Sequence, residues 1–94
     1  MKIKYSKKSL KFLAKQDNST VARIRTAIEK LTYSPPEGDI KVMQGSDKGK
    51  MRLRVGSYRV IYWYLKKNEK TESENGIIEI LYIDEIGNRG DIYK

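Results

Sequence analysis

Four cationic side chains stand at spaced positions in the stretch GKMRLRVGSYRVIYWY, which runs from Gly49 to Tyr64. Lys50, Arg52, Arg54 and Arg59 offer ammonium and guanidinium donors, and forked guanidinium groups match the oxygens of phosphodiesters. Trp63 adds an aromatic surface on which a base can stack, although a strand tryptophan is more often used in packing. These residue types indicate binding, or transition-state stabilisation, of a ligand with concentrated negative charge. The alternative is a solvated basic surface.

The sequence Gly56-Ser57 predicts a two-residue hairpin turn with glycine at the first central position, as in type II′ turns. Counting outward pairs Arg54 with Arg59 and Lys50 with Trp63, and strand side chains alternate between faces. One face then holds Met51, Leu53, Val55, Tyr58, Val60 and Tyr62, and the other holds Lys50, Arg52, Arg54, Arg59, Ile61 and Trp63. We expect the first face to be core. Because like charges on facing residues repel, the second face is better explained by a ligand than by solubility.

The composition narrows the class of protein. The 94 residues are expected to form one domain, 1–94, and 20 Lys plus Arg against 12 Asp plus Glu give a net charge of +8. This charge favours a polyanionic partner, with simple solubility as the alternative. The sequence has no cysteine and no histidine, which excludes disulfides, thiolate zinc sites and imidazole catalysis. We also expect no metal or other cofactor. Without an apolar run of about 20 residues or a signal peptide, the chain is expected to be cytoplasmic.

The elements that must position these cations follow from periodicity. Residues 1–5 alternate as a strand, and residues 6–16 read as a helix capped by Ser6, with Leu10, Leu13 and Ala14 on one face. A second helix, capped by Ser19 or Thr20, carries an apolar stripe of Val21, Ile24, Ile28 and Leu31. Pro35-Pro36 ends it, residues 40–50 read as loop with a brief strand at most, and strands follow from 50 to 65 and after the polar turn. The pattern predicts an α+β fold, an N-terminal strand and helical hairpin packed on an antiparallel sheet.

With these motifs in view, the sequence resembles the RelE/ParE toxin superfamily, the small toxins of bacterial type II toxin-antitoxin pairs. The resemblance covers nearly the whole chain: KFLAKQD and VARIRTAIEKL in the helices, PPEGDIKVMQG in the connection, RLRVGSYRVIYW in the hairpin and EIGNRGDIY at the end. It implies a β-α-α-β-β-β order, the same order that the periodicity indicates. It also implies a cognate antitoxin as partner, an acidic segment that wraps the basic surface.

For a RelE-like member, the resemblance implies metal-independent cleavage of mRNA on the ribosome by attack of the ribose 2′-hydroxyl on the adjacent phosphate. The catalytic set that it implies is Lys50, Arg52, Arg59, Arg89 and Tyr93. We expect Arg54, Trp63, Lys11 and Asn88 as further RNA contacts, although several family members carry histidine or another basic residue where this chain has Asn88. Arg52 stands where lysine is frequent in the family. Because arginine is a poor proton acceptor, the role of general base is left to Lys50 or to a carboxylate. The alternative for Lys11 is that it belongs to a solvated face of the first helix and does not contact RNA.

Two other functions stay open at this point. A ParE-like member would inhibit DNA gyrase by protein contact, and the basic strands would then be incidental. A nucleic-acid-binding module without catalysis would use the positive charge of the strands only to bind the nucleic acid. The acidic residues near the end of the chain, Asp84, Glu85 and Asp91, read more simply as surface charge and turn caps than as a catalytic base.

Overall fold

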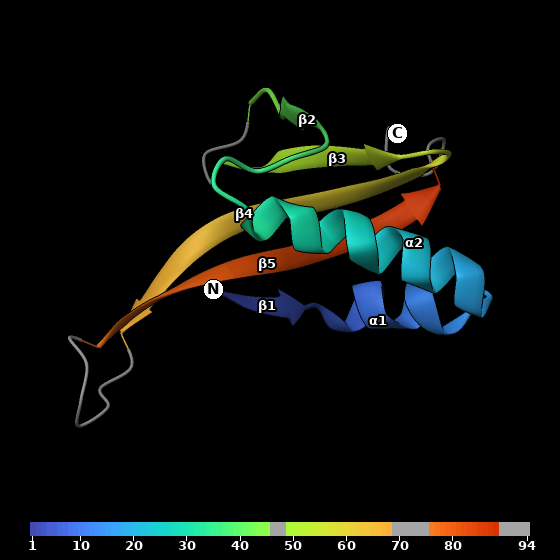
Figure 1. Ribbon diagram of the computed structural model, residues 1–94, viewed down its shortest axis with the longest axis horizontal. Coiled ribbons are helices and arrows are strands. Elements are labelled where there is room, and N and C mark those ends of the chain that lie inside the picture. Colours follow the sequence, from blue (N-terminus) through green and yellow to red (C-terminus); the bar gives the residue numbers. More distant parts are fainter. Residues whose placement is uncertain (46–48, 69–75, 89–94) are drawn as a thin grey trace.

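A computed structural model describes residues 1–45, 49–68 and 76–88 of the chain. Its helices and strands follow one another along the sequence in the order shown in Figure 1. They are β1 (Lys2–Tyr5), α1 (Lys7–Ala14), α2 (Asn18–Glu29), the short 3-10 helix η1 (Lys30–Thr32), β2 (Asp39–Val42), β3 (Met51–Val55), β4 (Tyr58–Asn68) and β5 (Ile77–Asn88).

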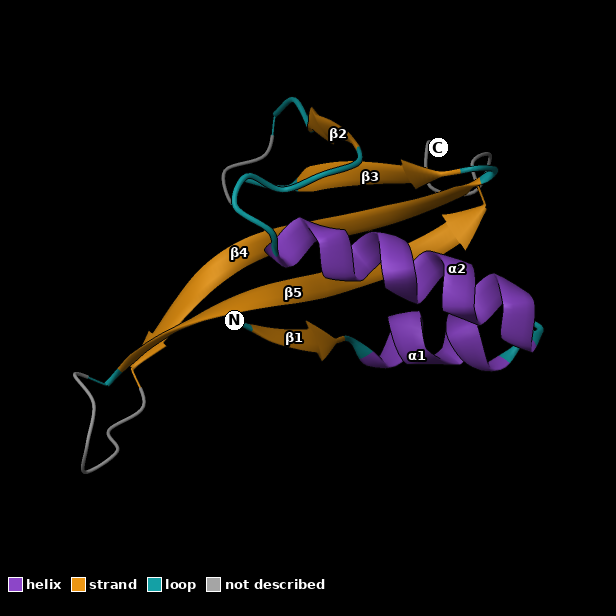
Figure 2. Cartoon of the chain, viewed as in Figure 1, coloured by secondary structure: helices purple, strands orange, loops and turns teal. Residues whose placement is uncertain are grey.

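The described strands form one five-stranded sheet in the order β1-β5-β4-β3-β2, with the helices packed beside it (Figure 2). The predicted α+β class and the leading strand and helix pair are confirmed. The expectation of a purely antiparallel sheet is wrong, because β1 pairs in parallel with β5. Both helices and three strands separate β1 from β5 along the chain, so no short hairpin turn requires the two strands to run antiparallel. The sheet is therefore mixed.

Both helices begin at side-chain caps. The Ser6 hydroxyl accepts a hydrogen bond from the Ser9 amide, as predicted. The cap of α2 is Asp17, which accepts from the Thr20 amide, and not Ser19 or Thr20 as expected from the sequence. A carboxylate at this position also meets the positive end of the helix dipole.

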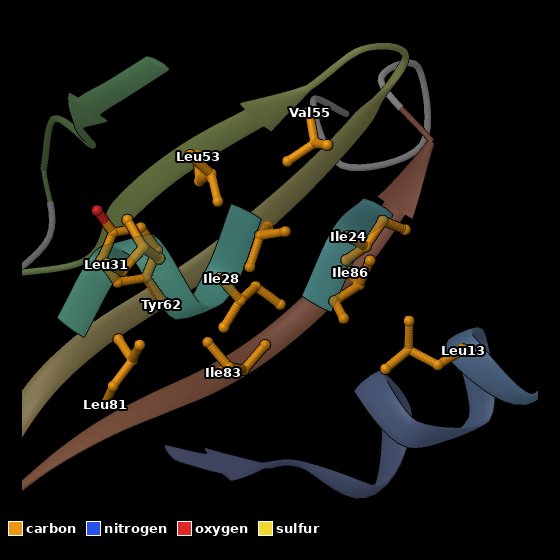
Figure 3. Packing of buried hydrophobic residues seen from close by; sticks show 11 residues of the cluster. Leu13, Ile24, Ile28, Leu31, Leu53, Val55, Tyr62, Leu81, Ile83 and Ile86 are labelled. Carbon is orange, nitrogen blue, oxygen red and sulfur yellow. The ribbon is translucent and has the colours of Figure 1, made fainter. Parts of the chain in front are cut away.

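The core lies between α2 and the sheet. Ile24, Ile28 and Leu31 of the predicted stripe are buried, and they pack on side chains from β3, β4 and β5 (Figure 3). These strand residues include Leu53, Val55, Val60, Tyr62, Leu81, Ile83 and Ile86. In α1 the buried face differs from the predicted one: Leu13 is buried, but Leu10 is 53% exposed. Phe12 instead reaches the core and packs edge-on against Tyr58, with ring centroids 5.9 Å apart.

The hairpin of β3 and β4 has the register that the turn predicted. Arg54 pairs with Arg59 and Met51 with Tyr62, as counted outward from Gly56-Ser57. Gly56 has φ +62°, which fits the first central position of a type II′ turn and which residues with a Cβ rarely adopt. The hairpin therefore presents the predicted core face to α2 and the predicted basic face to the other side of the sheet.

Strand β2 enlarges the basic side of the sheet. The sequence suggested a loop with a brief strand at most for residues 40–50, and the structure has such a strand at Asp39–Val42, paired antiparallel with β3. Asp39 lies opposite Arg54, and Lys41 lies opposite Arg52. Paired residues project to the same side of a sheet, so β2 brings an acid and a further lysine to the face that carries the arginines.

Candidate nucleic-acid interface

We call the sheet face turned away from α2 the outer face. The pairings and the strict alternation of side chains assign its residues, in strand order from β2 to β1. They are Asp39 and Lys41; Lys50 (the residue before β3, placed by its contact with Trp63), Arg52 and Arg54; Arg59, Ile61 and Trp63; Ile80, Tyr82 and Glu85; and Lys2 and Lys4. Lysines thus stand on the outer strands at both edges of this face, and arginines and aromatic rings stand between them.

The two arginines at the centre of the predicted site are buried. Arg52 is 5% exposed and Arg59 is 4% exposed, and Ile61 between them is 4% exposed. Alternation predicted the face on which they lie but not their burial, and the alternative of a solvated basic surface does not fit these two residues. Aliphatic stems of long cationic side chains pack readily against an apolar neighbour such as Ile61. These guanidinium groups are therefore held in place by packing.

Asp39 stands between the arginines of β3. Its carboxylate accepts a hydrogen bond from Arg54 Nε at 2.7 Å, and its other oxygen lies 3.7 Å from Arg52 Nη2. The hydrogen bond from Arg54 is the main reason why the pKa of the Asp39 carboxyl is lowered, and the charges of Arg54, Arg52 and Lys41 act in the same direction. One carboxylate thus orients two guanidinium groups, and an excess of positive charge remains around it.

Lys50 contacts an aromatic pair. Its ammonium lies 5.5 Å from the centroid of the Trp63 ring, within the range of cation-π attraction. The Trp63 ring lies next to Tyr82 of β5, with centroids 5.0 Å apart and ring planes tilted by 40°. Both rings are partly exposed. Trp63 therefore lies between a cation on one side and a second ring on the other.

The described carboxylates near the site serve the structure. Glu85 forms an ion pair with Lys8 of α1, with 3.1 Å between Oε1 and Nζ, and this contact is the main cause of the raised pKa of Lys8. Asp84 lies 4.0 Å from the same ammonium at the irregularity in β5, and its backbone oxygen accepts from the Ser6 hydroxyl at 2.6 Å. The reading of these acids as surface charge and caps agrees with this geometry.

The remaining candidate residues are spread more widely. Lys11 is exposed on α1, one turn after Lys8. Asn88 is the exposed last residue of β5 and lies opposite Tyr58, so alternation turns it toward the helix side of the sheet, away from Arg59. Arg89 and Tyr93 lie outside the described residues. The structure thus brings together Lys50, Arg52, Arg54, Arg59 and Trp63, and it does not bring Lys11 or Asn88 to the same face.

The sequence reading missed the residues that the other strands bring to the outer face, among them Lys4, Asp39, Lys41 and Tyr82. A signal for Asp39 and Lys41 was the alternation in Asp39–Val42, which is too short to distinguish from a loop. Lys4 and Tyr82 become neighbours only through the parallel pairing of β1 with β5. That pairing joins the first and last strands, and local patterns do not predict it.

The described residues contain neither a cluster of metal ligands nor a helix that could span a membrane. Within residues 1–45, 49–68 and 76–88, acidic side chains do not gather in threes where they could hold a metal ion. The helices of the described chain are too short or too polar to cross a membrane.

Comparison with known proteins identifies a shared fold. Neither a protein-family model nor a curated protein matches the sequence. Among solved structures, a chain of the archaeal RelE-RelB complex from Pyrococcus horikoshii OT3 is similar with a TM-score of 0.64 at 22% identity, and 96% of each chain is covered. A chain of the RelB-RelE antitoxin-toxin complex from Methanococcus jannaschii gives a TM-score of 0.63 at 22% identity, covering 96% of this chain and 94% of that one. At this identity the likeness establishes the fold.

Proposed function

We propose that this chain is the toxin of a toxin-antitoxin pair, a metal-independent endoribonuclease that cleaves mRNA on the ribosome and so inhibits translation. The observation that carries the proposal is the cluster of Lys50, Arg52, Arg54 and Arg59 on one face of the sheet, in the register that places Arg54 beside Arg59. The fold shared with chains of the two archaeal complexes supports the same conclusion.

In the proposed reaction the 2′-oxygen attacks the adjacent phosphorus, the bond from phosphorus to the 5′-oxygen breaks, and a 2′,3′-cyclic phosphate and a 5′-hydroxyl result. One proton leaves the 2′-hydroxyl and one is given to the departing 5′-oxygen. Arg52 and Arg59 stabilise the negative charge that builds up on the phosphoryl oxygens, since packed guanidinium groups need little reorganisation. Lys50 is our candidate for proton transfer, and Arg89 and Tyr93 complete the proposed catalytic set.

The proposed partner protein is an antitoxin with an acidic segment. A groove of about 470 Å³ runs between α2 and β3, with Ala22, Ala27, Leu53 and Val55 among its lining. Arg23 and Lys30 border it alongside a single acid, Glu37. Small apolar side chains within a cationic border suit an amphipathic segment with acidic flanks. The excess of positive charge over the whole chain favours the same partner.

The burial of Arg52 and Arg59 restricts access of a phosphate to these two groups, so the alternative is an RNA-binding module without catalysis, which would bind through the exposed cations of the outer face. Brief induction of the chain in a bacterial cell, followed by primer extension on several transcripts, tests the proposal. We expect new 5′ ends at preferred codon positions. Intact transcripts would overturn the ribonuclease, and gyrase trapped on DNA in the same cells would identify the gyrase-directed alternative.

Variants of one residue separate catalysis from binding. Arg59→Ala should reduce cleavage in a ribosome assay by about 100-fold or more, the scale expected for loss of a group that stabilises transition-state charge. Arg59→Lys should recover little, because an ammonium lacks the guanidinium fork. The matched control is Arg25→Ala on α2, where the guanidinium lies over Tyr5 instead. Equal cleavage by all three variants would remove Arg59 from the catalytic set.

A further inference from the structure

One row of the outer face crosses the sheet with two rings between two lysines. Lys4 of β1 pairs with Tyr82, and Tyr82 pairs with Trp63 of β4. Lys50 lies over the other side of Trp63, at 5.5 Å. The order along the row is therefore Lys4, Tyr82, Trp63, Lys50.

This row is separate from the arginines. Arg52 lies two residues from Lys50 along the strand, so the rows stand about 6.7 Å apart. Arg52 and Arg59 are buried and Arg54 is exposed, whereas Trp63 and Tyr82 are partly exposed and Lys4 is exposed. The register thus places a partly open aromatic row directly beside the proposed cleavage site.

We propose that this row binds a base of single-stranded RNA next to the cleavage site, with Lys4 and Lys50 holding the phosphates on either side of that base. The inference rests on the proposed function, since it takes RNA as the ligand. Single-strand binders combine aromatic rings for stacking with cations that follow the backbone, and a sheet face is a common support for both. The base contacts Tyr82 and Trp63 from the solvent side, and the Lys50 ammonium moves from the Trp63 ring to a phosphate.

An isolated pair of rings on a strand is more often packing, but here packing explains less. Residues Leu53, Val60 and Leu81, among others, fill the core on the opposite face, and neither Trp63 nor Tyr82 is part of that cluster. A lysine at each end of the row adds charge where packing alone needs none. An acidic protein segment would also be attracted to the lysines, and competition with a polyglutamate peptide tests that alternative.

Fluorescence gives a direct test, because Trp63 is the one tryptophan in the sequence. The probe is a short single-stranded oligonucleotide of 2′-deoxy sugars, which cannot be cleaved by 2′-hydroxyl attack. We expect saturable change in Trp63 emission. An abasic oligonucleotide of the same length and charge should bind about 10-fold more weakly, the scale of one lost stacking contact. Equal binding of the abasic probe would show that the rings do not read a base, and it would overturn the proposal.

Matched variants locate the effect. Tyr82→Leu should weaken binding of the deoxy-oligonucleotide by about 10-fold, and Tyr33→Leu, at an exposed tyrosine after η1, should not. Lys4→Gln should weaken binding more than Lys15→Gln, which removes the same charge at the end of α1. Circular dichroism checks that each variant is folded. Equal effects within each pair would overturn the row as the site. A polyglutamate peptide is the competitor. If it displaces the oligonucleotide, and if it binds the Tyr82→Leu variant as tightly as the unchanged chain, the row is a site for an acidic peptide and the proposal is overturned.

This test is independent of cleavage. A chain that does not cut RNA can still bind the deoxy-oligonucleotide through the row, and the proposed function then fails alone. A chain that cuts mRNA but binds the abasic probe as tightly as the normal one retains the proposed function and loses this inference.

Discussion

At the scale of single residues, Asp39 decides how the cations of the outer face are arranged. It lies between Arg52 and Arg54 and repels any phosphate that approaches them. Asp39→Asn removes this repulsion while keeping an acceptor for Arg54. We expect the variant to bind a single-stranded deoxy-oligonucleotide more tightly at low salt, as measured by fluorescence titration. If it binds more weakly, the carboxylate acts mainly by orienting the arginines.

The same residue predicts a dependence of stability on pH. The pKa of the Asp39 carboxyl in the folded chain is lowered from its ordinary value of 3.8, so the folded state favours the charged form. Its contribution is present above pH 3.8 and is lost as the pH falls through the lower folded-state pKa. Asp39→Asn should therefore have a lower urea midpoint at pH 7, and the difference should shrink as the pH falls below 3.8 and through the folded-state pKa of the carboxyl. A constant difference across this range would contradict the prediction.

At the scale of elements, the turn between β3 and β4 sets which residues share a face. Gly56 has φ +62°, and a Cβ built there would lie 2.5 Å from Nη2 of Arg23. The end of an arginine side chain can move, but the backbone strain remains. Gly56→Ala should lower the free energy of unfolding by about 1 kcal/mol or more. Urea denaturation measures it, with Ser57→Ala as the control expected to change little.

A hydrogen bond between layers gives a second prediction for the elements. The Tyr64 hydroxyl of β4 donates to the backbone oxygen of Leu31 at 2.7 Å, which fixes the end of the helical segment over the sheet. Tyr64→Phe keeps the ring and removes the bond. We expect a loss of about 1 kcal/mol in the free energy of unfolding, the usual net value of such a bond. A variant as stable as the original would show that water replaces the contact at no cost.

The elements also show what local sequence could predict. The stripe in α2 and the hairpin register were predictable, because both depend on a short repeat and a turn of two residues. The buried face of α1 was not, since Leu10 and Phe12 exchange roles according to how the helix meets β4 and β5. For the site, the face of the arginines followed from alternation. The burial of Arg52 and Arg59 depends on which side chains pack around Ile61, and a local sequence pattern does not contain that information.

At the scale of the whole molecule, the net charge of +8 is distributed between the two sides of the sheet. Lysines of α1 lie on the helix layer, whereas Lys4, Lys41 and Lys50 belong to the outer face. If nucleic acid binds the outer face, only the second group should release counterions on binding. If only the total charge mattered, lysines of both groups would contribute equally to binding. The salt dependence of binding by individual variants therefore shows whether the position of a lysine matters.

We therefore predict different salt slopes for variants with the same net charge. For single strands, each phosphate contact contributes a slope of about 0.7 to the plot of log affinity against log salt. Lys50→Gln and Lys4→Gln should each reduce the slope by about this amount for a deoxy-oligonucleotide, whereas Lys15→Gln should leave it unchanged. Fluorescence titrations of Trp63 between low and moderate salt give these slopes. Equal reductions by all three would mean that binding follows the total charge, because the sheet face then holds the strand no more closely than the helices do.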